Sequence, residues 1–291
     1  MTTASVFSIA FLVGACVGSF LNVCVARWPR ELSVIRPGSR CPTCGHRLRW
    51  YENIPLASWI VLRGRCRCCR EPISFQYPAV ELAVALGWVA AVWQLGPTLE
   101  ALRVAVFGTT LLGIAITDAR HYLIPDGFTL FGLLWILATS LVGFFLIEPS
   151  HFATPYDALI GACTGAGMIA IVGWLGEVAL RREAMGLGDV TLMAFVGAAV
   201  GPARALVTVF IGATLAAAVF IGVVYPLIAL TRRSRPQRRG SQQTELALGG
   251  RNGSAASPLD APLVPFGVFL APAAMLTLLW GDALLSWIVQ R

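Results

Sequence analysis

This sequence carries unusually little charge for its length. Only 13% of its 291 residues are charged and 57% are hydrophobic, whereas about a quarter of the residues in a soluble domain are charged. The composition therefore excludes an ordinary soluble protein and indicates a membrane protein. Lysine is absent and all 22 basic residues are arginine, which we interpret as a feature of composition rather than of mechanism.

Other absences narrow the architecture. No segment has an extended β pattern that competes with the apolar runs, and no glycine-rich cofactor loop is present. The segment from Met1 to Val25 lacks both a positive n-region and a clear small-x-small cleavage site. We therefore expect it to remain as a first membrane span rather than to be removed as a signal peptide.

Eight apolar runs are candidate membrane spans, because a helix needs about 20 apolar residues to cross a hydrocarbon core of about 30 Å. The runs are Ala4–Ala26, Ala79–Leu95, Ala101–Thr117, Phe128–Ile147, Ala158–Leu180, Val190–Val200, Ala205–Leu230 and Leu263–Val289. They predict an all-α polytopic membrane protein with about eight transmembrane helices. The sixth run, which a break at Gly201-Pro202 separates from the seventh, is roughly 17 Å long as a helix and too short to cross alone.

Arginine is distributed unevenly among the loops between these runs. Arg27–Pro78 carries ten arginines, and Asp118–Gly127, Arg181–Asp189 and Thr231–Pro262 carry one, two and six. The alternate loops carry one between them. The positive-inside rule therefore places the arginine-rich loops in the cytoplasm and both termini outside. Since membrane topology accounts for the net positive charge of the chain, we expect the chain to contact membrane lipid and not to bind nucleic acid.

Five of the eight cysteines lie in the first arginine-rich loop, as Cys41-x-x-Cys44 and, further on, Cys66-x-Cys68-Cys69. Two C-x-x-C pairs at this separation are typical of a structural zinc site with four thiolates. Two disulfides are the alternative, but the loop is predicted to face the reducing cytoplasm. We choose Cys66 and Cys69 as the second pair because they keep the two-residue spacing, although Cys68 can replace either.

Two aspartates stand out at the inner ends of the spans. Asp118 closes the third run, and Asp189 opens the sixth after Gly186-x-Gly188. An acid at membrane depth is costly and points to function, and two carboxyl groups that share a proton can act as base and acid. The two glycines allow the backbone to approach closely beside Asp189. Taken singly, however, each acid can simply end a helix in headgroup water.

Taken together and in order, these segments resemble the type IV prepilin peptidases, the leader peptidases of pilus and type II secretion systems. The resemblance rests on the following segments: Gly18–Val23, Arg27–Pro29, Trp50–Pro55, Leu62–Gly64, Tyr77–Leu82, Asp118–Asp126, Glu183–Asp189 and Pro265–Gly267. It covers most of the chain except the polar stretch Ser234–Ser257, for which we predict a disordered cytoplasmic linker near residues 232–261.

The resemblance implies a function and roles for particular residues. It makes Asp118 and Asp189 the catalytic pair, with Asp126, Glu183, Gly186 and Gly188 in support. The implied activity is removal of the leader from prepilins or pseudopilins at the cytoplasmic face of the bacterial inner membrane. Many members with a cysteine-bearing loop then methylate the new N-terminus with S-adenosylmethionine. The corresponding division is a first helix at 1–26, a zinc-binding loop domain at 27–78 and a membrane peptidase domain at 79–291.

Two positions depart from the family pattern. Thr191 stands where a lysine is common, which changes the electrostatics around Asp189. Val268 stands where a proline is common, which we expect to change only the local backbone.

Two other classes of function are alternatives to a peptidase. A proton-coupled transporter that uses Asp118 and Asp189 as a relay predicts internal repeats, which the sequence lacks. A non-catalytic scaffold anchored by the zinc loop leaves both aspartates unexplained.

Overall fold

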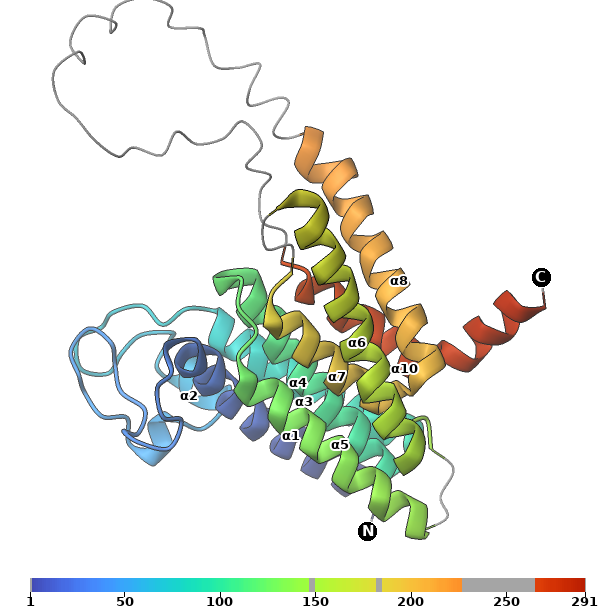
Figure 1. Cartoon of the computed structure of the whole chain (residues 1–291). Coiled ribbons are helices and arrows are strands. Elements are labelled where there is room, and N and C mark those ends of the chain that lie inside the picture. The colour runs from blue at the N-terminus through green and yellow to red at the C-terminus, as the bar shows by residue number, and fades with distance from the viewer. Residues whose placement is uncertain (1, 147–149, 182–184, 227–264, 291) are drawn as a thin grey trace, which may run out of the picture.

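The computed structural model describes residues 2–146, 150–181, 185–226 and 265–290 of the chain (Figure 1). Glu183 and the predicted linker near 232–261 lie outside these residues. The described part of the chain is helical and contains no β-strand, only two isolated β-bridges. The prediction of an all-α protein is therefore confirmed.

Eight main helices and three short ones make up the described residues. The main helices are α1 (Thr3–Arg27), α3 (Gln76–Leu95), α4 (Leu99–His121), α5 (Asp126–Leu146), α6 (Pro155–Leu180), α7 (Leu187–Val200), α8 (Pro202–Val219, continued by the π-helical turn Phe220–Val224) and α10 (Gly267–Val289). The short ones are η1 (Trp28–Arg30), η2 (Trp50–Glu52) and α2 (Ala57–Val61). Seven of the main helices are long and apolar enough to cross a membrane, and α7 is the shorter exception.

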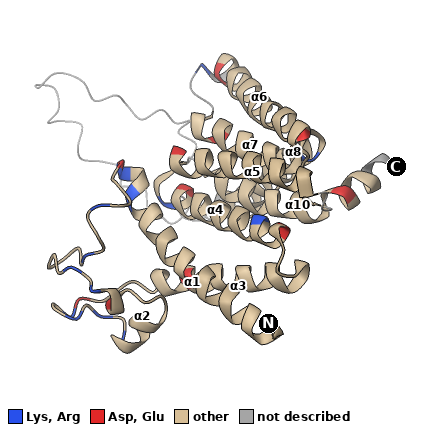
Figure 2. Ribbon diagram, turned by 90° about the horizontal axis from the view of Figure 1, so that it is seen from below, with Lys and Arg blue, Asp and Glu red and all other residues tan. Residues whose placement is uncertain are grey.

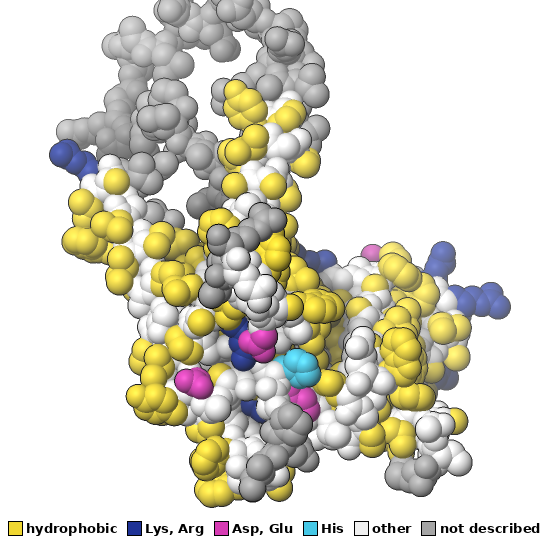
Figure 3. All heavy atoms as spheres, turned by 90° about the vertical axis from the view of Figure 1, so that its right-hand side faces the viewer, with side chains coloured by type: hydrophobic (Ala, Val, Ile, Leu, Met, Phe, Trp, Pro, Cys, Tyr) yellow, Lys and Arg dark blue, Asp and Glu magenta, His cyan; other side chains and the backbone are white. Residues whose placement is uncertain are grey.

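The outer surface of the helices is apolar, as a protein in lipid requires. Large hydrophobic side chains stay exposed along the helices, for example Phe145 at 73%, Trp174 at 62% and Phe210 at 75%. Figure 3 shows how sparse the charged side chains are among hydrophobic ones on one face. The chain is therefore a multi-pass membrane protein.

Helix α7 lies inside the bundle rather than at its surface. It packs against α5, α6, α8 and α10, and Leu192, Met193 and Phe195 are fully buried. Its 14 residues span only about 21 Å. The helix ends as predicted, because Gly201 adopts a φ of +82° and Pro202 then begins α8. A helix this short avoids exposing backbone to lipid because other helices surround it.

The crossing of α6 and α7 depends on glycine. A Cβ atom at Gly161 would lie 2.1 Å from the carbonyl oxygen of Gly197, and one at Gly165 would lie 2.2 Å from that of Met193. The two backbones are therefore in direct contact, as small residues permit in membrane proteins. On the other side of α7, the rings of Phe195 and Phe107 of α4 lie 5.1 Å apart. These contacts fix the position of α7 within the bundle.

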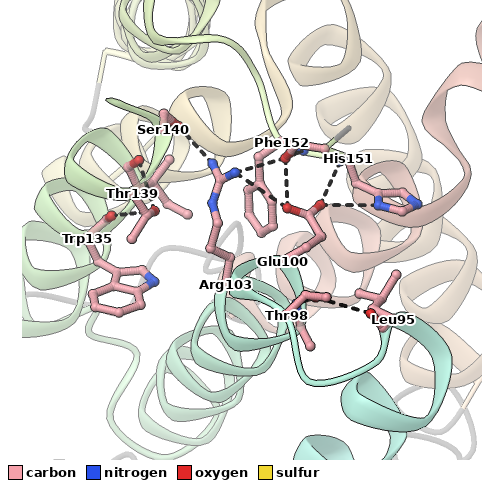
Figure 4. A network of polar contacts seen from close by, with 12 residues as sticks. Leu95, Thr98, Glu100, Arg103, Trp135, Thr139, Ser140, His151 and Phe152 are labelled. Carbon is pink, nitrogen blue, oxygen red and sulfur yellow. Dashed lines mark hydrogen bonds and ion pairs between the residues drawn. The ribbon is translucent and has the colours of Figure 1, made fainter. Parts of the chain in front are cut away.

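A buried ionic network joins α4 and α5 at the end of the bundle away from the α4–α5 turn (Figure 4). Arg103 is 2% exposed and donates to Ser150 at 2.8 Å and to Ser140 at 2.9 Å. It lies 3.5 Å from the Glu100 carboxylate and 4.1 Å from the centre of the Phe152 ring. The predicted topology places Arg103 on the outer side of the membrane. Its positive charge is balanced inside the protein by the Glu100 carboxylate.

The polypeptide between α1 and α3 forms a separate loop domain at the C-terminal end of α1. Basic side chains are concentrated there, as Figure 2 shows by their blue colour, whereas the helices carry few of them. The short helix α2 lies within this domain (Figure 1). This loop follows the first helix directly, while the division of the chain into domains stays a prediction.

Candidate active site and metal site

The two cysteine turns of the loop domain have the same local structure. In the first, the N–H of Gly45 donates to the carbonyl of Cys41 at 3.0 Å, and Gly45 has a φ of +71°. In the second, the N–H of Arg70 donates to the carbonyl of Cys66 at 3.0 Å, and Arg70 has a φ of +61°. An isolated antiparallel β-bridge flanks each turn. The turns are therefore two copies of one cysteine-bearing structural motif.

The register of these turns identifies the second pair of cysteines. With Cys41 matched to Cys66, Cys69 corresponds to Cys44, and Cys68 corresponds to a position in the first turn that holds no cysteine. The sulfurs of the four matched residues all lie within 4.8 Å of one another, with Cys41–Cys69 at 3.8 Å and Cys44–Cys66 at 4.0 Å. Tetrahedral zinc with bonds of about 2.3 Å places its sulfurs about 3.8 Å apart. The four cysteines therefore fit a zinc ion, and all are free rather than joined in disulfides.

The thiols differ in how readily they ionise. Backbone N–H groups of Cys44 and Thr43 lower the pKa of Cys41 to about 6. Although the N–H of Glu71 acts in the opposite direction, burial and the neighbouring thiols raise the pKa of Cys69 to about 12. The Cys41 thiol thus ionises readily, and its negative charge disfavours ionisation of the neighbouring thiols. A divalent cation would stabilise all four thiolates together.

Glu52 joins the two cysteine turns. Its buried carboxylate accepts a hydrogen bond from the N–H of Arg49 at 2.9 Å and lies 3.2 Å from His46 Nε2 and 3.5 Å from Arg67 Nη1. The Arg49 N–H, followed by His46 and Arg67, holds the pKa of Glu52 below its usual range despite burial. Since His46 follows the first turn and Arg67 lies in the second, Glu52 holds both in one arrangement.

Two buried polar side chains act where the loop domain meets the membrane helices. Glu81, in the second turn of α3 and 8% exposed, accepts a hydrogen bond from the N–H of Leu56 in the loop domain at 2.7 Å. Asn22 of α1 donates to the carbonyl of Tyr77 in the first turn of α3 at 3.1 Å. The loop domain is therefore attached to α3, and α1 and α3 are joined beside it.

The end of α1 also contacts the turn that carries the first aspartate motif. A Cβ atom at Gly127 would lie 2.6 Å from the ring of Trp28, whose ring centre lies 4.4 Å from that of Phe128. The loop domain and the α4–α5 turn thus lie at the same end of the bundle. Asp126, the first residue of α5, is exposed there.

Asp118 lies in the last turn of α4, and its side chain is buried, with 5% of the residue exposed. Its Oδ2 atom accepts a hydrogen bond from the N–H of Val268 at 3.2 Å. A Cβ atom at Gly267 would lie 2.9 Å from the same oxygen. The start of α10 is therefore in direct contact with Asp118.

Asp189 lies in the first turn of α7 and is half-buried. Its backbone N–H donates to the carbonyl of Gly186, the N-cap residue of the helix, at 3.2 Å. A Cβ atom at Gly188 would lie 2.9 Å from the Cβ atom of Ile124, whose Cδ1 atom also contacts Gly267. The structure thus brings Asp118, Asp189 and the start of α10 together around Ile124, while the catalytic and supporting roles of the acids stay predictions.

The two departures from the family pattern have different consequences. Thr191 donates from its hydroxyl to the carbonyl of Gly188 at 3.1 Å, so a neutral side chain lies beside the second motif. The expectation that Val268 changes only the local backbone is wrong, because its N–H is bonded to Asp118.

Sequence reasoning missed the residues that act across motifs. Ile124 and Glu81 both lie in segments on which the family resemblance rests, but the sequence analysis gives neither of them a role. An acid in the apolar run of α3 was the available signal for Glu81. For Ile124 and Val268 the sequence held no signal, because their importance comes from contacts with distant segments.

Comparison with known proteins agrees with this geometry. The profile of the bacterial peptidase A24 N-terminal domain matches residues 12–95, and that of the type IV leader peptidase family matches residues 105–221. No solved structure matches the chain.

Curated relatives carry related names. A prepilin leader peptidase/N-methyltransferase of Myxococcus xanthus is 40% identical over 80% of this chain and 66% of its own length. One of Pseudomonas aeruginosa is 33% identical over 96% of this chain and 92% of its own length. A type 4 prepilin-like proteins leader peptide-processing enzyme of Escherichia coli is 35% identical over 67% of this chain and 77% of its own length. The chain belongs to the type IV leader peptidase family.

Proposed function

We propose that this chain removes the leader peptide from prepilins or pseudopilins at the cytoplasmic face of the bacterial inner membrane. The observation that carries the proposal is the placement of Asp118 and Asp189, from two distant motifs, around Ile124 and Gly267 at one end of the helical bundle. A prepilin is cut where its basic leader meets its hydrophobic segment. An acid pair at the end of membrane helices is suited to that junction.

The two carboxyl groups supply the acid and the base that peptide hydrolysis needs. One ionised carboxylate removes a proton from water as the water oxygen bonds to the scissile carbonyl carbon. The other carboxyl group gives its proton to the carbonyl oxygen. Collapse of the tetrahedral species breaks the C–N bond, and a proton passes to the leaving nitrogen. Because the pair titrates together, we describe the proton as shared by Asp118 and Asp189.

Charge distribution supports the cytoplasmic orientation. The loop domain and the last residue of α1 hold ten of the 22 arginines, and they lie at the same end of the bundle as Asp118, as the contact between Trp28 and Gly127 requires. By the positive-inside rule this end faces the cytoplasm. The zinc ion that Cys41, Cys44, Cys66 and Cys69 would hold is structural, since four thiolates complete its coordination.

The names of the relatives also support a second step, N-methylation of the new N-terminus with S-adenosylmethionine. We place this donor in the groove of about 310 Å³ between α1 and the loop domain. Phe20 and Val34 form its apolar part, and Asn53 is among its polar lining residues. The Arg27 guanidinium also lines the groove, where it donates to the carbonyls of Ser33 and Gly38. The donor supplies an electrophilic methyl group for the substrate amine.

The test is cleavage of a synthetic prepilin by the purified, detergent-solubilised protein, with labelled S-adenosylmethionine and mass measurement of the product. Asp118→Asn and Asp189→Asn each abolish cleavage, and the double variant loses no more than either single one, because the two groups act as a unit. Asp126→Asn retains part of the activity.

Asp282→Asn is the matched control, since Asp282 lies on α10 with 87% of its side chain exposed. Turnover like that of the wild type by either Asp118→Asn or Asp189→Asn rejects the proposed pair. The alternative of a proton-coupled transporter finds no support in the three relatives described above, which are named as leader peptidases or a leader peptide-processing enzyme.

A further inference from the structure

The lipid-facing surface of α3 continues onto the loop domain. Four large exposed side chains lie on one face of this helix, because the pitch of an α-helix returns to the same side at their spacing. They are Phe75, Leu82, Leu86 and Trp93. Phe75 is 69% exposed and directly precedes α3. The apolar stripe therefore extends to the end of the span that carries the loop domain.

The short helix α2 adds apolar side chains beside Phe75. The rings of Trp59 and Phe75 lie 5.8 Å apart in an edge-on contact, and the indole N–H of Trp59 donates to the carbonyl of Ile73 at 3.2 Å. These contacts hold α2 next to the start of α3. Ile60 and Val61 of α2 are 68% and 79% exposed. We call Ile60, Val61 and Phe75 the α2 patch.

The segment that leads into α2 lies beside the membrane helices. The N–H of Leu56, the N-cap residue of α2, is bonded to Glu81 in the second turn of α3. Asn53 and Pro55 line the groove together with Phe20, which lies about two turns before the end of α1. These contacts put α2 at the depth of the ends of α1 and α3, where a bilayer has its headgroup region.

The charges next to the α2 patch are positive. From Ile54 to Cys66 the charged residues are Arg63 and Arg65, both of which are exposed. An apolar surface bordered by arginine matches the cytoplasmic leaflet of a membrane. Its acyl chains accept apolar side chains, and its anionic headgroups attract basic ones. Because the patch is continuous with the lipid-facing stripe of α3, a lipid surface is the partner that it fits.

We propose that α2 is an interfacial membrane anchor for the loop domain. The α2 patch enters the cytoplasmic leaflet at the boundary between headgroups and acyl chains, and Arg63 and Arg65 contact lipid phosphates. The anchor holds the cysteine-bearing loop domain against the membrane surface beside α1 and α3. It needs neither aspartate, so a failure of the two-aspartate function leaves it unaffected.

Photo-crosslinking to lipid tests the anchor. The full chain carries the photoreactive residue p-benzoylphenylalanine in place of Val61 and is reconstituted in nanodiscs of phosphatidylcholine and phosphatidylglycerol. Irradiation should add the mass of one phospholipid, because the excited ketone bonds to a nearby acyl carbon. The same residue in place of Arg47, which is exposed beside the first cysteine turn, is the control. It should give no lipid adduct, because the α2 patch and not the whole loop domain enters the bilayer.

A charge placed in the patch gives a second measurement. Ile60→Asp, combined with the photoreactive residue at Val61, should lower the yield of lipid adduct about tenfold or more, because a carboxylate is costly among acyl chains. Ile60→Leu is the matched control and should keep the yield. Equal temperatures of unfolding of the two variants in detergent show that Ile60→Asp is folded. If it is not, the adduct at Val61 in the otherwise unchanged chain still decides.

The result expected is a phospholipid adduct at Val61 that is absent at Arg47 and is lost in Ile60→Asp. The anchor is overturned if Val61 gives no lipid adduct or if Val61 and Arg47 give equal yields. An adduct of Val61 with a second copy of the chain, or with added prepilin, overturns it as well, since a protein then covers the patch. An unchanged yield in folded Ile60→Asp does the same.

Discussion

At the scale of single residues, the second aspartate motif depends on contact with the first. Gly188 packs against Ile124, which follows Asp118 in the α4–α5 turn. Gly186 lies in the same motif but has a φ of −80°, and the nearest atom to a Cβ there is the backbone nitrogen of Gly188 at 3.9 Å. The two glycines therefore have different reasons to be small, and only Gly188 determines the spacing of the motifs.

This difference yields a prediction with a control in the same turn. Gly188→Ala should lower kcat for prepilin cleavage about ten- to a hundred-fold, because the new methyl group moves Asp189 away from Asp118. Gly186→Ala should cleave at nearly the wild-type rate. Steady-state kinetics on a synthetic prepilin measures both. Equal rates for the two alanine variants would contradict the proposed role of the Gly188–Ile124 contact.

At the scale of elements, α7 is held by backbone contact and by burial on several sides. It is too short to span the membrane, yet it carries Asp189, so its depth depends on its neighbours. The crossing of Gly161 with Gly197 determines its distance from α6, and Phe195 packs against Phe107 of α4. At the far end of α4, the buried pair of Arg103 and Glu100 fixes α4 relative to α5. The contacts that position the helices of both aspartates are thus distributed through the whole bundle.

The α6–α7 crossing can be tested by adding one methyl group. Gly161→Ala would place a Cβ atom 2.1 Å from the carbonyl oxygen of Gly197, so the helices must separate, at a cost of about 1–3 kcal/mol. We expect a lower temperature of unfolding in detergent and slower cleavage. Gly167→Ala, on the same helix but facing open space, should be neutral or slightly stabilising because alanine favours a helix. A Gly161→Ala protein as stable as Gly167→Ala would contradict direct backbone contact.

At the scale of the whole molecule, the cysteine-bearing loop domain is attached to the membrane helices by few buried polar contacts. Glu52 joins the two cysteine turns, and Glu81 links the loop domain to α3. The loop domain is small and lacks β-strands within the described residues. We therefore expect a metal ion at the four cysteines to supply much of the free energy that keeps this domain folded.

Metal analysis of cysteine variants tests this organisation. The purified protein should contain one zinc ion per chain. Cys69→Ser should lose it, because Cys69 is the counterpart of Cys44, whereas Cys68→Ser should keep it. Elemental analysis gives the zinc content, and limited proteolysis should show cuts in the loop domain of Cys69→Ser while the membrane helices stay intact. Zinc retained in Cys69→Ser and lost in Cys68→Ser would show that the second turn uses the other cysteine.

The sequence alone determined the features that depend on local pattern. Apolar runs identified the membrane helices, and the Gly201-Pro202 break separated α7 from α8 because it interrupts a helix whatever surrounds it. Repeated C-x-x-C spacing indicated the metal site, and two acids at span ends indicated a reaction centre. Each of these signals lies within a short segment, where spacing and residue type suffice.

Only the tertiary structure decided which distant segments meet. It brought α10 to Asp118, Ile124 to Gly188 and Glu81 to Leu56. It also showed which of two similar cysteines matches Cys44, because the backbone of the two turns is the same. These contacts join residues far apart in the chain, and packing of whole helices sets them. No local pattern records a backbone N–H such as that of Val268, because its partner depends on where the helix begins in space.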